Sequence, residues 1–221
     1  MMEAFQQIVL WIHIIAGGIA LIIGLVPMVS EKGSMLHIQS GKIYYWAMFL
    51  VFISALLRFR PEMKLIFLEC IAIFSFYNTF TGRRLVQMKL GMNPQLIDWI
   101  ALYTAFLFAT IMAGISVWGF INHNTFLWVT LGFFSMFCFR LVLTDWQIFN
   151  KQVLPENMHW MLNHIARMTG SYIATLTAFI VVNNKGYLPE LVAWLSPAVI
   201  GTLGIIRWRS YYRSKFSQKI L

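Results

Sequence analysis

The residues best suited to chemistry in this chain lie at the start of the segment 159–183, HWMLNHIARMTGSYIATLTAFIVVN. The segment is too apolar for a helix of a soluble protein, yet only its 14 residues 169–182 are fully compatible with lipid. A membrane-spanning helix needs about 20 residues, so a span here draws His164 and Arg167 below the headgroups and His159 to their edge. Ionisable groups at that depth are costly, and they indicate a functional site by default.

Other polar residues are expected at a similar depth. Arg140 and Asp145 end the preceding apolar stretch, His37 lies in a loop, and Ser171 shares a helix face with His164. The sequence therefore predicts one polar pocket near one membrane surface, lined by His37, Arg140, Asp145, His159, His164, Arg167 and Ser171. Two arginines and up to three histidines face roughly one acid there. This balance favours an anionic or strongly polar ligand: a lipid phosphate, a carboxylate or a quinone carbonyl.

Structural interpretations of the same residues stay open. His164 could hold helices together by a hydrogen bond, and His159 could rest at the interface. Arg140 could reach the headgroups, or pair with Asp145 about one turn away.

Haem binding is one alternative. Two axial histidines must lie at one depth, whereas His13 and His164 fall in opposite halves of the membrane, which leaves His164 with a loop histidine or a methionine. His13 instead lies at the depth of Glu69, and we expect these two to form a second polar pair that could share a hydrogen bond.

A zinc-dependent enzyme is a further alternative. His37, His159 and His164 with Asp145 or Asp98 would supply the three protein ligands that a catalytic zinc ion takes besides water. No motif fixes their spacing, however. The sequence identifies no cofactor and no oligomeric state.

Composition assigns the chain to the membrane proteins. Of its 221 residues 59% are hydrophobic and 11% charged, whereas a soluble domain carries about 25% charged residues. The formal net charge is +9, but the basic residues form no compact stripe with interleaved aromatics, which argues against nucleic acid as a partner. Cys70 and Cys138 lie in apolar stretches without a CxxC motif, so we expect small buried side chains.

Hydropathy predicts an all-α, polytopic transmembrane helix bundle that occupies residues 1–221 as one domain. Seven apolar stretches are near the length of a span: 6–29, 43–60, 63–81, 98–120, 125–146, 158–183 and 189–207. Most lysines and arginines fall on one side and in the C-terminal tail. The rule that cytoplasmic loops are basic then places the C-terminus in the cytoplasm and the N-terminus outside.

Several motifs resemble a family of bacterial integral membrane proteins catalogued as domain of unknown function 2306. They are H-x3-GG-x-AL-x2-G at 13–24, KGSMLHIQSGKIYYWAM at 32–48, SFYNTFTGRR at 75–84, HIARMTGSYIATLTAFIVVN at 164–183 and LPELVAWLSPAVIGT at 188–202. The resemblance spans nearly the whole chain, although Ile38 stands where the family commonly has arginine after the histidine. It implies a multi-pass protein of the bacterial inner membrane, and no known reaction.

The sequence thus predicts an inner-membrane protein that binds or transports a small anionic or polar ligand, or a lipid headgroup. A redox enzyme with haem or quinone, or a zinc-dependent enzyme, using the same histidines is the alternative.

Overall fold

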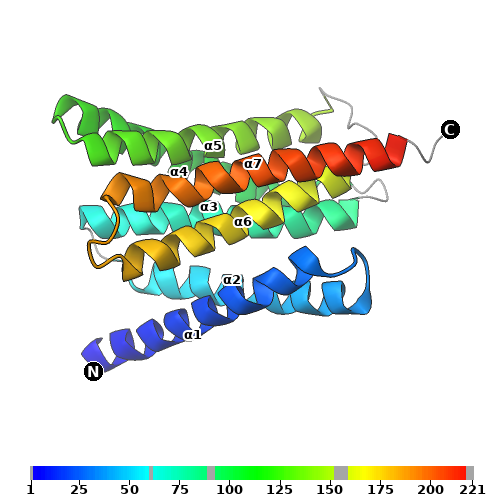
Figure 1. Ribbon diagram of the computed structural model, residues 1–221. Helices are drawn as coiled ribbons and strands as arrows, with labels where there is room; N and C mark the ends of the chain where they lie inside the picture. The colour runs from blue at the N-terminus through cyan, green and yellow to red at the C-terminus, as the bar shows by residue number, and fades with distance from the viewer. Residues whose placement is uncertain (1, 60–61, 89–92, 152–158, 218–221) are drawn as a thin grey trace.

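The chain folds into a bundle of long helices that run along a common axis (Figure 1). The computed structural model describes residues 2–59, 62–88, 93–151 and 159–217, and these residues contain seven α-helices and no strand. The helices are α1 (Met2–Val29), α2 (Met35–Leu57), α3 (Met63–Met88), α4 (Leu96–Ile121), α5 (Thr125–Phe149), α6 (His159–Asn183) and α7 (Glu190–Ser217). Because seven helices alternate in direction, α1 begins at one end of the bundle and α7 finishes at the other.

Six of these helices are long and apolar enough to cross a membrane: α1, α2, α4, α5, α6 and α7. Large apolar side chains on the outer faces of these helices, such as Ile22, Val182 and Ile200, are at least 70% exposed. A soluble monomer rarely exposes wide apolar patches, whereas lipid solvates them. The prediction of a multi-pass helical membrane protein is therefore confirmed at this level.

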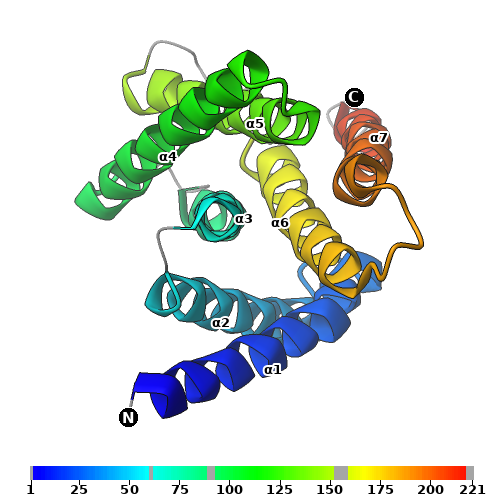
Figure 2. The same ribbon diagram turned by 90° about the vertical axis from the view of Figure 1, so that its left-hand side faces the viewer.

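Helix α3 is the exception among the predicted spans. It packs against α2, α4, α5 and α6 (Figure 2), and its buried side chains include the polar residues Glu69, Asn78 and Thr79. A helix enclosed by other helices needs little lipid-compatible surface, so it tolerates polar groups that bond to its neighbours. The central position of α3 explains why it is less apolar than the helices around it.

Two helix boundaries differ from the prediction in ways that move functional residues. α2 begins at Met35 rather than near position 43, because the Ser34 side chain accepts a hydrogen bond from the His37 backbone N–H and caps the helix. His37 therefore lies on the first turn of a helix and not in a loop. α7 continues through Pro197 to Ser217, which adds Arg209 to the helical surface.

Candidate functional site

Two cavities lie on different sides of α6. The first, here the arginine cavity, has a volume of about 500 Å³ between α3, α5, α6 and α7, and Arg140, Asn163, Arg167 and Arg209 line it. The second, here the histidine cavity, has a volume of about 610 Å³, and residues of α1, α2, α3, α6 and α7 line it, including His37, Arg83, His164 and Met168. Both lie within the size range of ligand pockets.

The single pocket expected from the sequence is therefore divided. Arg140, His159 and Arg167 line the arginine cavity, His37 and His164 line the histidine cavity, and Asp145 and Ser171 line neither.

Helical periodicity accounts for this division. Asn163 and Arg167 are four residues apart and share one face, as do His164 and Met168. Consecutive residues of an α-helix point about 100° apart, so the two pairs face different neighbours. The sequence predicted one pocket because depth in the membrane does not show which neighbouring helix each side chain faces.

Arg167 forms a buried, charged polar network with neighbouring helices. Its Nη2 donates to Asp145 Oδ1 at 2.6 Å, and its Nη1 donates to the Thr81 hydroxyl at 2.8 Å. The Tyr77 hydroxyl donates to the other oxygen of Asp145 at 2.5 Å. The network joins α3, α5 and α6. Asp145 is thus the acid of Arg167 and not of Arg140, and both Nη atoms of Arg167 donate to groups inside the protein.

Sequence reasoning missed Tyr77 and Thr81. They lie four residues apart on α3, whose burial the hydropathy pattern did not reveal. The Arg167 Nε atom is buried and has no hydrogen-bond partner among the described residues. Buried donors without partners are rare in proteins, and one at a cavity wall is consistent with a bound acceptor.

Arg140 contrasts with Arg167. Arg140 is exposed and lines the arginine cavity. Within the described ranges no hydrogen bond or ion pair holds its guanidinium. Only its backbone carbonyl is engaged, by the Thr144 hydroxyl at 2.8 Å.

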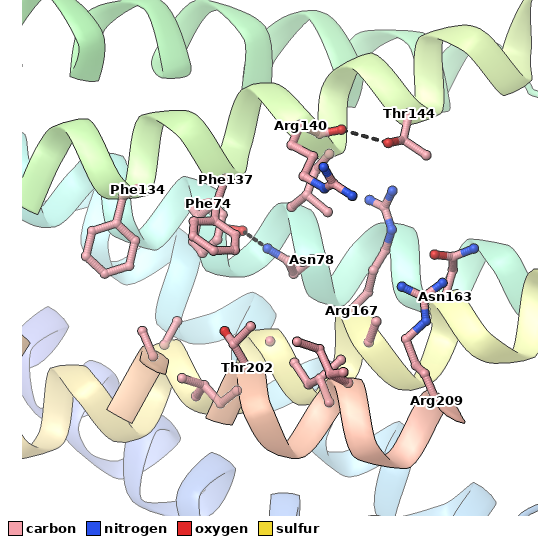
Figure 3. Close-up of a pocket in the computed structure, with 18 of the residues that line it drawn as sticks. Phe74, Asn78, Phe134, Phe137, Arg140, Thr144, Asn163, Arg167, Thr202 and Arg209 are labelled. Carbon is pink, nitrogen blue, oxygen red and sulfur yellow. Dashed lines mark hydrogen bonds between the residues drawn. The ribbon is translucent and has the colours of Figure 1, made fainter. Parts of the chain in front are cut away.

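The arginine cavity has two chemically different ends. Figure 3 shows Arg140, Arg167, Asn163 and Arg209 gathered at one end, with Phe74, Phe134 and Phe137 at the other. His159 belongs to the polar end, since the Asn163 amide nitrogen lies 3.0 Å from its ring nitrogens. Among the residues that the structure describes, no aspartate or glutamate lines the cavity.

Ser171 serves the core instead of a cavity. It is fully buried, and its hydroxyl lies 2.8 Å from the Tyr44 hydroxyl and 2.5 Å from that of Thr79. This cluster ties α6 to α2 and α3. Ser171, which the sequence placed in the ligand pocket, lines neither cavity, because its helix face meets packed helices at that level.

The histidine cavity holds two tethered imidazoles. His37 Nδ1 lies 3.0 Å from the Pro27 carbonyl oxygen, and His164 Nδ1 lies 2.7 Å from the Gly82 carbonyl oxygen. A carbonyl can only accept, so each Nδ1 carries the proton. The two ring centres lie 6.3 Å apart.

Cationic side chains line the same cavity as these rings. The Lys32 amino group donates to the carbonyls of Pro27 and Met28 and thereby caps α1, and burial lowers its pKa. The Arg83 guanidinium lies over the Tyr45 ring at 4.3 Å. No acidic side chain in the described part of the chain lines this cavity either.

No family model, curated protein or solved structure matches this chain. The chemistry of the two cavities follows from their geometry.

The donor set proposed for zinc is dispersed. His159 lies in a different cavity from His37 and His164, Asp145 pairs with Arg167, and Asp98 pairs with Arg84 at 2.7 Å. Among the described residues, no three His, Cys, Asp or Glu side chains lie close enough to hold one metal ion.

The second polar pair is not formed. His13 Nδ1 lies 2.9 Å from the Ser54 hydroxyl of α2, and Glu69 Oε2 is buried without a hydrogen-bond partner. The strong pairing of α1 with α2 gives His13 a nearer partner than α3 offers. Cys70 and Cys138 are buried and free, as expected for small apolar side chains.

Proposed function

We propose that this protein binds an anionic amphiphile in the arginine cavity: a lipid-like molecule with a phosphate or carboxylate head and an apolar chain. The observation that carries the proposal is the Arg140 guanidinium, which has no acidic partner in the described chain and stands at the polar end of a cavity whose other end is aromatic. Arginine binds phosphate and carboxylate through paired N–H donors, so it suits both heads.

The charges of the cavity support this ligand class. Arg167 is neutralised by Asp145, while Arg140 adds positive charge, and no carboxylate of the described residues lines the wall. A positive charge near lipid that lacks an internal counter-ion attracts an anion. Phe133, Phe134, Phe137 and Ile173 then offer an apolar surface to the chain of the ligand.

We further propose that the polar ends of both cavities face the cytoplasm of a bacterial cell, with the N-terminus outside. Lys32, Arg83 and Arg209 lie at this end of the bundle, and basic residues concentrate on the cytoplasmic side of membrane proteins. A cavity in this place could take its ligand from the inner leaflet, either for binding alone or as the first step of transport.

The test uses purified protein in a neutral detergent, titrated with dodecyl phosphate and followed by calorimetry. Dodecanol, with the same chain, and inorganic phosphate, with a head but no chain, are the comparison ligands. We expect saturable binding of dodecyl phosphate and much weaker binding of either fragment.

Arg140→Gln is the informative variant, and Arg213→Gln, an exposed arginine of the same end that does not line the cavity, is its matched control. Loss of one charge-assisted contact should weaken dodecyl phosphate binding by about 10- to 100-fold. Equal weakening in both variants would mean general charge attraction and would overturn the assignment to this cavity.

A further inference from the structure

The histidine cavity presents a pair of imidazoles that the anionic-ligand site does not use. Both rings donate Nδ1–H to a backbone carbonyl, Pro27 for His37 and Gly82 for His164. In the neutral ring this leaves Nε2 with a free lone pair. Proteins orient metal-binding histidines in this way, by a hydrogen bond from the other ring nitrogen to a carbonyl or carboxylate.

The second nitrogen of each ring, Nε2, is open as far as the described residues show. No hydrogen bond to Nε2 of His37 or His164 is formed by the residues that the structure describes. The two rings come from different helices, α2 and α6, and their centres lie 6.3 Å apart.

This separation fits one metal ion held from both sides. An imidazole nitrogen binds iron or zinc at about 2 Å, and that nitrogen lies roughly 1 Å from its ring centre. Two imidazoles on opposite sides of one ion therefore place their centres about 6 Å apart. Their 67° interplanar angle is no obstacle, since two imidazoles on opposite sides of one ion can bind it at any angle between their planes.

The number of protein ligands available indicates which kind of metal site this is. No third His, Cys, Asp or Glu of the described chain joins the pair, whereas a protein zinc site takes three or four such ligands. A haem iron needs only one or two axial ligands from the protein, because the porphyrin supplies the other four.

The walls of the cavity suit a porphyrin. Its volume is about 610 Å³, with aromatic side chains such as Trp160, Tyr172 and Trp208 along the wall. Gly33 and Gly41 flank His37 in sequence, and a Cβ added at either would meet nothing within 4 Å. Lys42 and Arg83, which also line the cavity, can receive the two propionate carboxylates.

We propose that the histidine cavity is a b-type haem site with His37 and His164 as the two axial ligands. Helical bundles commonly build such sites from side chains of facing helices. The site is separate from the arginine cavity, and it stands whether or not that cavity binds an amphiphile.

The test is titration of the purified protein with hemin, followed by absorption spectroscopy. We expect saturation at about one haem per chain with the spectrum of six-coordinate, low-spin iron. His37→Ala and His164→Ala should each abolish the low-spin spectrum and weaken hemin binding by about tenfold or more. Free imidazole added to either variant should restore that spectrum, which shows that the variant is folded and lacks only the ligand.

The control is His123→Asn. His123 is exposed between α4 and α5 with a φ of 55°, a conformation that asparagine tolerates, so this variant should bind hemin like the unaltered protein. Absence of a saturable low-spin species in the unaltered protein would overturn the proposal. A low-spin spectrum that survives both alanine substitutions would do the same.

Discussion

The two cavities beside α6 have similar linings and different chemistry. Both carry cations, and no carboxylate of the described residues, on their walls. In the arginine cavity one guanidinium is fixed by Asp145, while that of Arg140 has no partner among the described residues. In the histidine cavity each imidazole is fixed at one nitrogen by a backbone carbonyl and open at the other. The first arrangement suits attraction of an anion, the second coordination of a metal.

The difference arises from the partner that fixes each side chain. A side-chain carboxylate neutralises the charge it holds, so Arg167 supports the cavity wall rather than the ligand. A backbone carbonyl orients an imidazole and leaves its second nitrogen basic. Adjacent positions of one helix can therefore supply a structural ion pair on one side and metal ligands on the other.

The largest predicted effect is on stability, at the arginine cavity. Asp145→Ala leaves the buried Arg167 without its counter-ion, and this should destabilise the protein by about 3–5 kcal/mol. Chemical unfolding in detergent measures the change. Replacing both partners by apolar residues, Asp145→Leu with Arg167→Met, should recover most of the loss. If Asp145→Ala unfolds at the same denaturant concentration as the unaltered protein, the ion pair does not support the wall.

A second prediction concerns the contact between α3 and α6 at Gly82, which lies between the two cavities. A Cβ at Gly82 would lie 2.9 Å from Met168 Sδ, in the histidine cavity, and 3.2 Å from Arg167 Cβ, in the arginine cavity. Gly82→Val should therefore push α3 from α6 and destabilise by about 1–3 kcal/mol. Thermal unfolding gives the comparison with Gly114→Val, where an added Cβ meets nothing within 4 Å. Equal unfolding temperatures for the two variants would show that α3 and α6 are not in close contact at Gly82.

The smallest predicted effect separates ligand binding from folding. Arg140 is exposed and unpaired in the described structure, so Arg140→Gln should change the free energy of unfolding by no more than about 0.5 kcal/mol. The same unfolding assay checks this. A loss comparable to that of Asp145→Ala would assign Arg140 to the structural network and remove the free cation from the arginine cavity.

Much of the fold follows from the sequence because lipid imposes a simple rule of length and apolarity. All seven helices lie where apolar stretches were predicted, and α5 begins at the expected residue, Thr125. The start of α2 was misplaced, since a polar first turn capped by Ser34 has no hydropathy signal. The membrane orientation and the resemblance to domain of unknown function 2306 stay predictions.

The site was predicted only in part. Depth along the helices brought Arg140, Asp145, His164 and Arg167 to one end of the bundle, where the structure also has them. Depth does not say which helix each side chain faces, so the division between cavities and the Asp145–Arg167 pair could not be derived. The pairing of His37 with His164 depended in addition on the true start of α2.

The most direct test of two independent sites measures both ligands on the same two variants. Arg140→Gln and His164→Ala are each titrated with dodecyl phosphate and with hemin. We predict that Arg140→Gln weakens dodecyl phosphate binding by about 10- to 100-fold and keeps the low-spin haem spectrum. His164→Ala should lose that spectrum and bind dodecyl phosphate like the unaltered protein. If either substitution impairs both ligands equally, or neither impairs its own, the account of two chemically distinct cavities is contradicted.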